Sequence, residues 1–279
     1  MVNNWLDYFQ LVYISILFPF YLYFTIHLGY KIYFVKVPVL YNEFFPIIFY
    51  KGVIDNITFF VQFTTSRIQK YHVLTSFFLS NSFLSYILYF VTSATYFIMF
   101  QIAFLTSFNR YIAISKPLKY KEYFHTKKLL IYFLIMSILG IVVGTAAIIF
   151  PCSYVYYPEI NRVSATCQDQ KTAYVHTIVA LFLNLPLLII TAILNFCCIY
   201  KSRFISRKNK SKISKDYKIV IYNTLLFFVM VAFEVYFLFK NLPYILQNYY
   251  FLETLALQSL SWIIDAMTFG IFLFSLVLS

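Results

Sequence analysis

The sequence predicts an all-α protein, a bundle of seven transmembrane helices with its N-terminus outside the cell. Hydrophobic residues make up 62% of the 279 residues and charged residues only 11%, far from the roughly half apolar and one-quarter charged composition of soluble domains. The apolar residues form seven runs of about 20 residues, the length that spans a bilayer as a helix. The basic residues gather between these runs on alternate sides. We therefore expect one seven-helix transmembrane domain over residues 1–279.

Each run has its own justification as a span. The first has no basic residue before it, is longer than a signal-peptide core and lacks a small-residue cleavage site, so we interpret it as a retained helix. The second is the least apolar, because it contains Lys51 and Asp55. The third ends next to a basic segment, and the last four are separated by polar or charged loops. The predicted spans are residues 8–30, 44–63, 83–108, 129–150, 174–200, 219–239 and 255–278.

The distribution of basic residues sets the orientation. With the N-terminus outside, the three inner loops hold two, six and eight of the 22 Lys and Arg residues, 16 in all. The excess agrees with the rule that cytoplasmic loops are the basic ones. It also explains the net charge of +12 without nucleic acid as a partner. The outer loops hold only Arg67, Lys70, Arg162, Lys171 and Lys240.

The most specific motif lies at the inner end of the third span. It reads Asn109-Arg110-Tyr111 and continues as Ile-Ala-Ile-Ser-Lys-Pro-Leu. This resembles the Asp-Arg-Tyr motif of rhodopsin-like G-protein-coupled receptors, and the whole chain is similar to nematode serpentine chemoreceptors, nearest the Srg superfamily (class gamma, V, U or X). The resemblance implies that Arg110 faces the G-protein cleft, with Tyr111 beside it. An ordinary topological anchor is the alternative for Arg110.

The resemblance also has departures. Asn109 stands where the family has an acid, and an amide cannot form an ion pair, so we expect a weaker inactive-state lock and raised basal activity. The sixth span lacks Trp and Pro near residues 227–236, and the seventh lacks the Asn-Pro-x-x-Tyr sequence. Rhodopsin-like receptors tie the second outer loop to a Cys in the third helix, which is missing near Ser85. A disulfide between Cys152 and Cys167, both in that outer loop, is the expected alternative to two free thiols.

Four charges fall within the predicted spans, where charges are costly and often functional. Lys51 and Asp55 are one helical turn apart and can pair, and Asp265 is predicted to approach the same depth as Asp55. The resemblance implies a polar core of Lys51, Asp55 and Asp265 that can bind sodium, whereas a purely structural Lys51–Asp55 pair makes such a site unnecessary. Glu234 is expected in the outer half of the sixth span, facing either a basic ligand group or the membrane surface.

The third span also predicts pocket residues. Eighteen residues before Arg110 correspond to about 27 Å of helix, which brings Thr92 near the outer end, with Thr95, Tyr96 and Met99 on the following turns. We name these four residues and Glu234 as ligand-binding candidates, with ordinary helix packing as the alternative for each.

These observations together predict a chemosensory G-protein-coupled receptor in the plasma membrane, in sensory cilia if the resemblance holds. It would bind an external small molecule or peptide and a heterotrimeric G protein, and its basic third inner loop, residues 201–218, would contact anionic lipids. We expect no catalytic residue, no metal and no cofactor. A ligand-gated channel or transporter with the same spans is the alternative, favoured if the four intramembrane charges meet on one path.

Overall fold

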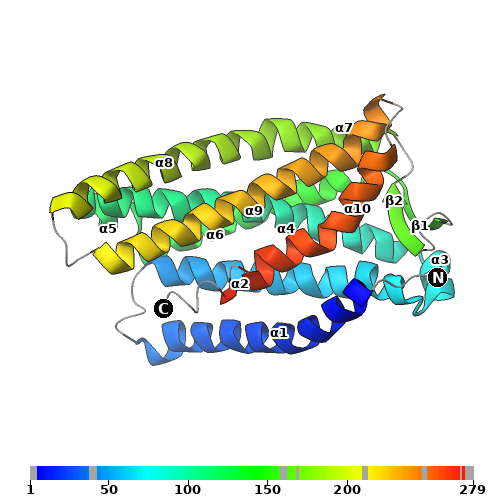
Figure 1. Cartoon of the computed structure of the whole chain (residues 1–279), viewed down its shortest axis with the longest axis horizontal. Coiled ribbons are helices and arrows are strands. Elements are labelled where there is room, and N and C mark those ends of the chain that lie inside the picture. The colour runs from blue at the N-terminus through cyan, green and yellow to red at the C-terminus, as the bar shows by residue number, and fades with distance from the viewer. Residues whose placement is uncertain are drawn as a thin grey trace.

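A computed structural model describes residues 5–37, 43–157, 162–167, 170–208, 213–246, 250–270 and 272–273 (Figure 1). The described part is a bundle of long helices with one two-stranded sheet. Several helices are followed by a short π-helical or 3₁₀ segment, labelled η. The elements are α1 (Trp5–Tyr30), η1 (Lys31–Val35), α2 (Phe44–Gln62), η3 (Phe63–Arg67), η4 (Ile68–Tyr71), α3 (Thr75–Ser80), α4 (Phe83–Ser115), η5 (Pro117–Lys119), α5 (Tyr120–Tyr123), α6 (Thr126–Ala147), β1 (Cys152–Tyr157), β2 (Arg162–Cys167), α7 (Gln170–Val179), η7 (Ala180–Asn184), α8 (Leu185–Lys208), α9 (Ile213–Leu246), α10 (Tyr250–Asp265) and η8 (Ala266–Gly270).

Six helical segments of the described chain are long and apolar enough to cross a membrane. They cover residues 7–35, 44–71, 83–115, 126–147, 171–203 and 220–241. The seventh predicted span corresponds to α10 and η8. At 16 residues, α10 alone is only about 24 Å long, so it needs its π-helical continuation to approach the thickness of the hydrocarbon layer.

The central helix of the bundle is α4. In its most apolar stretch 72% of the residues are buried, against 44% or less in the other five spans. It packs against α2, α6, α8 and α9, so it connects most of the bundle along its whole length. Its 33 residues extend about 50 Å, well beyond the hydrocarbon layer on at least one side.

Two glycines let α6 approach α4 closely. A Cβ atom at Gly140 would lie 2.6 Å from the Ile98 side chain, and one at Gly144 would lie 2.7 Å from the carbonyl oxygen of Phe90. Both positions therefore exclude larger residues. Their spacing of four residues is the small-residue pattern that brings membrane helices into contact.

The outward faces of the peripheral helices are apolar. On α1 the exposed side chains recur every three or four residues, which defines one helical face. Because a lipid environment leaves such faces without a hydrophobic penalty, their exposure fits a membrane-embedded bundle. Examples are Phe9, Val12, Ile16, Phe20 and Tyr23 of α1, Ile131, Leu134, Ile138 and Val142 of α6, and Ile189, Ile193 and Phe196 of α8.

The two ends of the bundle differ. The start of α1, the short helix α3 and the hairpin β1–β2 lie at one end, and α5 lies at the other (Figure 1). We call these the outer and inner ends, after the predicted orientation. The hairpin is held against the outer end by two tyrosines: Tyr154 donates to the carbonyl of Thr65 at 2.9 Å, and Tyr89 donates to that of Ala165 at 2.9 Å. Burial raises the pKa of the Tyr154 hydroxyl above its usual value, so this donor keeps its proton.

Candidate functional site

The second helix continues beyond its apolar run and carries basic residues into the bundle. The sequence predicts an end at residue 63, with Arg67 and Lys70 in a loop, but η3 and η4 extend the helix to Tyr71. Its polar residues tolerate this because their hydroxyls bond to their own helix, as Thr64 does to the Phe60 carbonyl at 2.9 Å. The π-helical turn at η3 inserts an extra residue per turn, a geometry often found at functional sites. Arg67 is only 4% exposed.

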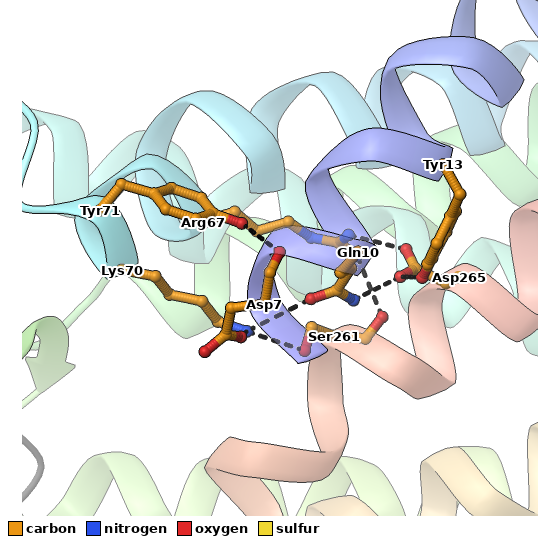
Figure 2. A network of polar contacts seen from close by, with 8 residues as sticks. All are labelled: Asp7, Gln10, Tyr13, Arg67, Lys70, Tyr71, Ser261 and Asp265. Atoms are coloured by element: carbon orange, nitrogen blue, oxygen red, sulfur yellow. Dashed lines mark hydrogen bonds and ion pairs between the residues drawn. The ribbon is translucent and has the colours of Figure 1, made fainter. Parts of the chain in front are cut away.

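Arg67 forms an ion pair with Asp265, the last residue of α10. Its Nη1 atom lies 2.7 Å from Asp265 Oδ1, and its Nη2 atom donates to the carbonyl of Ser261 at 3.1 Å. The other carboxylate oxygen, Oδ2, accepts hydrogen bonds from the Gln10 amide and the Tyr13 hydroxyl of α1. The Asp265 carboxylate therefore joins three segments that are far apart in the sequence (Figure 2).

Lys70 extends this cluster toward the start of α1. Its Nζ atom lies 3.2 Å from Asp7 Oδ1 and donates to the Ser261 hydroxyl at 3.1 Å. The Tyr71 hydroxyl donates to the backbone carbonyl of Asp7 at 2.9 Å. Two cations and two carboxylates thus balance each other at the outer end of α1, η3–η4 and α10 (Figure 2). We call this set the outer network: Asp7, Gln10, Tyr13, Arg67, Lys70, Tyr71, Ser261 and Asp265.

Two of the other predicted intramembrane charges, Lys51 and Asp55, form a separate cluster. Lys51 and Asp55 are an ion pair within α2, with side chains 3% and 0% exposed. The Tyr21 hydroxyl donates to Asp55 at 2.7 Å, and Lys51 also reaches the Met267 carbonyl at 3.3 Å.

The polar core expected from the sequence is therefore divided. Asp265 is bound by Tyr13 and Asp55 by Tyr21, positions eight residues apart on α1 and so separated by about 12 Å of helix. The depth of the two aspartates along their spans predicts one cluster. In the structure, however, Asp265 forms an ion pair with Arg67, a residue that the sequence predicts in a loop. Asp55 and Asp265 thus have different partners, and a polar core shared by Lys51, Asp55 and Asp265 stays a prediction.

A cavity of about 60 Å³ lies at the outer end beneath the hairpin. Its walls come from the end of α2 and η3, from α4, α7, α9 and α10, and from β2. We call it the outer pocket. Its lining residues are Gln62, Ser66, Leu88, Tyr89, Thr92, Ser93, Tyr96, Ser164, Ala165, His176, Tyr236, Phe237, Lys240, Asn241 and Leu260.

The outer pocket borders the outer network. Ser66 and Leu260 line the pocket, and the next residues in the chain, Arg67 and Ser261, belong to the network. A change in the position of η3 or α10 therefore affects both at once.

Two of the five ligand-binding candidates line the outer pocket. Thr92 and Tyr96 face it together with Tyr89 and Ser93, as the spacing of one helical face requires. Thr95 lies outside the lining, its hydroxyl bonded to the Val91 carbonyl at 2.8 Å.

The other two candidates are packed elsewhere. Met99 is 1% exposed within the hydrophobic core. Glu234 is 5% exposed and lies beside Asn184 of η7. Its side chain is buried, so of the two predicted orientations the one toward the membrane surface is not observed, and the one toward a ligand stays a prediction.

Asn109, Arg110 and Tyr111 lie at the inner end of α4. Asn109 is buried and donates to the Tyr120 hydroxyl at 2.9 Å. The Arg110 guanidinium lies over the ring of Phe44, 4.3 Å from its centroid. Burial raises the pKa of Tyr120, which keeps this loop residue neutral. The amide thus binds the loop helix α5 and not the neighbouring arginine.

Lys201 connects this inner end to α8. Its ammonium lies 5.1 Å from the centroid of the Tyr111 ring and donates to the Ser115 hydroxyl at 2.9 Å. Tyr111 and Ser115 are one turn apart, so one lysine binds two residues on the same face of α4.

The β1–β2 hairpin contains both cysteines of the expected disulfide, Cys152 and Cys167. Cys152 is disulfide-bonded, and its backbone pairs with that of Cys167 in the strand register. Cys197 and Cys198 are free thiols. The Cys167 side chain lies outside the described part of the structure, so the predicted partner stays a prediction that this register supports.

One comparison with known proteins gives a match. A family model described as serpentine type 7TM GPCR chemoreceptor Srx matches residues 24–278. No curated protein matches the chain. The family match supports the resemblance to serpentine chemoreceptors of the nematode type, but it does not support the Srg assignment expected from the sequence.

Proposed function

The chain belongs to the Srx family of serpentine seven-transmembrane chemoreceptors, and on that premise we propose that the outer pocket binds an external small molecule while the inner end of α4 couples to a heterotrimeric G protein. The observation that carries this proposal is that a single buried helix serves both sites. Tyr96 lines the pocket and Arg110 lies 14 residues later, about 21 Å along α4. A ligand that moves α4 at one end therefore moves Arg110 at the other.

The ligand acts by changing the populations of two conformations, since a ligand shifts an equilibrium only when it binds one state more tightly. The outer network is the element that we propose to differ between them, because η3 and α10 contribute to the network and to the pocket wall alike. Arg67 and Asp265 are 2.7 Å apart here. We propose that agonists favour a state in which this pair is rearranged.

At the inner end we propose a weak inactive-state lock. In the resembled receptors an acid precedes the arginine, whereas Asn109 here binds Tyr120 and Arg110 lies over Phe44. An amide cannot form an ion pair with the neighbouring arginine, so Asn109 cannot supply the lock that an acid supplies at that position. The receptor should therefore signal measurably without ligand.

The alternative hypothesis of a channel or transporter receives no support from the partners of the charged residues. It required Lys51, Asp55, Glu234 and Asp265 to meet on one path. Lys51 and Asp55 bind each other, Asp265 binds Arg67, and Glu234 lies beside Asn184. We propose the plasma membrane, and sensory cilia within it, as the location, which an N-terminally tagged copy in living animals would test.

The proposed coupling can be measured without a known agonist. Receptor reconstituted in lipid nanodiscs is mixed with purified G-protein α subunits and βγ, and GTP-analogue exchange is compared with empty nanodiscs. We expect exchange above the empty-disc level, reduced at least about tenfold in Arg110→Ala, equivalent to roughly 1.4 kcal/mol. Lys127→Gln, an exposed basic residue at the same end of the bundle, is the control and should exchange like wild type. Equal nucleotide exchange with wild type and with Arg110→Ala would show that Arg110 does not take part in G-protein coupling.

A further inference from the structure

Three acidic side chains are buried in the described part of the bundle, and one of them differs from the other two. Asp55 pairs with Lys51, and Asp265 pairs with Arg67. Glu234 of α9 is 5% exposed, yet neither of its carboxylate oxygens has a hydrogen-bond partner among the described residues, and none of their ion pairs includes it. Within this part of the chain, Glu234 therefore has no counter-charge.

Glu234 lies within the predicted hydrocarbon layer. It belongs to the apolar span of residues 220–241, and seven residues, about 10 Å of helix, separate it from the outer end of that span. An ionised carboxylate without a partner costs much free energy at this depth. A buried acid in such surroundings binds a proton and becomes neutral. The position of Glu234 thus favours the protonated carboxyl group.

Asn184 provides an acceptor for this proton. It is the last residue of η7, is 3% exposed and lies beside Glu234. Its amide oxygen has no hydrogen-bond partner among the described residues. An ionised carboxylate offers only acceptors, whereas a protonated carboxyl group has one O–H donor. One proton therefore satisfies the acid of α9 and the amide oxygen of η7 together.

The π-helical segment η7 presents Asn184 to the inside of the bundle. Leu181, Phe182 and Leu183 are exposed, whereas Ala180 and Asn184 are buried. η7 packs against α9, the helix that carries Glu234. A π-helical turn contains one residue more than an α-helical turn and is frequent at functional sites. Here it places a polar side chain in an otherwise apolar segment of the span.

The charged and titratable side chains of the neighbouring elements have other partners or positions. The elements packed against α9 are α4, α7, α8, α10, η7 and η8, and η7 and η8 contain no titratable residue. The groups of these helices that point into the bundle include His176, Tyr89, Tyr96, Tyr236 and Lys240 in the lining of the outer pocket, Asp265 at Arg67, Arg110 over Phe44 and Lys201 at Ser115. Among the described residues, Asn184 is the polar group that acts on Glu234.

We propose that Glu234 is a proton-binding site, whose carboxyl group holds a proton in this arrangement and donates it to the amide oxygen of Asn184. The site joins α9 to η7 in the outer half of the bundle. When α9 and η7 separate and water reaches the carboxyl group, the proton is released to water and Glu234 becomes an anion. Because one arrangement binds the proton and the other does not, rising pH favours the separated arrangement.

The surroundings of Glu234 favour a proton over a larger cation. A metal ion such as calcium needs about six to eight oxygen ligands, whereas a proton needs one acceptor. An organic ammonium group needs a cavity, but Glu234 lines neither the outer pocket nor the small cavity between α1 and α2. A proton requires no space beyond that of the two side chains.

Infrared spectroscopy of the full-length receptor tests the site directly. A protonated carboxyl group has a C=O stretch that is separate from the bands of carboxylates and amides. We expect this band in wild type at neutral pH, in alkyl maltoside micelles that contribute no carbonyl group, and its loss in Glu234→Gln. Gln keeps the shape of the side chain and an N–H donor for Asn184. Asp7→Asn, which removes a partly exposed acid of the outer network, is the control and should keep the band.

The pH dependence of stability gives a second readout. If the native protein holds one proton on Glu234 that the unfolded chain releases, the unfolding equilibrium constant rises by up to about tenfold per pH unit above about pH 4.3, where free Glu ionises. Rising pH should therefore destabilise wild type relative to Glu234→Gln, which has no proton to release at this position. Both proteins contain the same histidines, so the comparison cancels their titration.

Each outcome decides for or against the proton site. The same infrared band in wild type and Glu234→Gln, or parallel pH profiles of their stability, would overturn it. A band that sodium chloride abolishes and choline chloride leaves unchanged would overturn it in favour of a metal cation. If Glu234→Gln does not fold, wild type with heavy carbon in its Glu carboxyl groups decides, because the band must then shift to lower frequency. These measurements involve no nucleotide exchange, so the proton site and G-protein coupling can fail independently.

Discussion

Two buried ion pairs of the bundle differ in how many helices they join. Lys51 and Asp55 lie one turn apart on the same helix, so their mutual contact persists however that helix moves. Arg67 and Asp265 come from the second and the last helical segments, so their contact exists only while η3 and α10 keep their present positions. The first pair neutralises charge within one helix, whereas the second forms only while η3 and α10 keep one arrangement. Only the second can distinguish two conformations of a receptor.

The largest effect should come from removing one partner of each pair. Asp265→Asn leaves Arg67 buried without a counter-charge, and an arginine cannot lose its proton, so we expect a loss of about 3–5 kcal/mol in the free energy of unfolding. Asp55→Asn leaves Lys51 with an amide oxygen one turn away on its own helix and with the Met267 carbonyl as a further acceptor, so we expect a smaller loss of about 1–3 kcal/mol. Reversible unfolding in mixed micelles measures both.

Asp7→Asn is the control for this comparison. It removes an ion pair of the same outer network, with Lys70, but the Asp7 side chain is 31% exposed, and such pairs contribute about 0–1 kcal/mol. A loss for Asp55→Asn equal to or above that for Asp265→Asn would contradict the distinction between the two pairs.

A sharper comparison uses two tyrosines of the same helix. Tyr13 donates to Asp265 and Tyr21 donates to Asp55, so Tyr13→Phe and Tyr21→Phe each delete one hydroxyl from one cluster. Asp265 keeps Gln10 and Arg67, whereas Asp55 keeps only Lys51 among the residues that the structure describes. We expect a loss of about 1.5–3 kcal/mol for Tyr21→Phe and of about 0.5–1.5 kcal/mol for Tyr13→Phe. The same unfolding measurement decides, and a reversed order would mean that the Asp265 carboxylate depends on α1 more than on η3.

The two pairs also show which contacts can be predicted from the sequence and which cannot. The spacing of Lys51 and Asp55 is visible in the chain and indicates a pair directly, and the apolar runs and basic loops indicate the helices and their orientation. Arg67 and Asp265 are 198 positions apart, and their contact depends on η3 continuing as a π-helix beyond the apolar run. Hydropathy alone places Arg67 in a loop, because Thr64, Thr65 and Ser66 interrupt the run.

The outer pocket was predictable in part for the same reason. Counting back along α4 from Arg110 gave the correct region, and Thr92 and Tyr96 line the pocket. The count gives the depth of a residue in the helix but not the direction of its side chain. It therefore also selects Thr95 and Met99, which do not line the outer pocket. Lys240 was missed because it follows the apolar part of its helix. Its spacing of four residues from Tyr236, which also lines the pocket, was the available signal.

The smallest effect concerns the inner end, where Asn109 precedes Arg110. Asn109→Asp introduces a carboxylate next to Arg110, where the present amide binds Tyr120. A new pair with Arg110 should stabilise the inactive state by about 1 kcal/mol, because the desolvation of a carboxylate at this buried position offsets most of its attraction to the arginine. Basal nucleotide exchange should then fall by about threefold to fivefold, while the free energy of unfolding changes little. Asn109→Ala removes the contact with Tyr120 without adding a charge, and its basal exchange should equal or exceed that of wild type. If Asn109→Asp leaves basal exchange unchanged, the amide is not what weakens the lock.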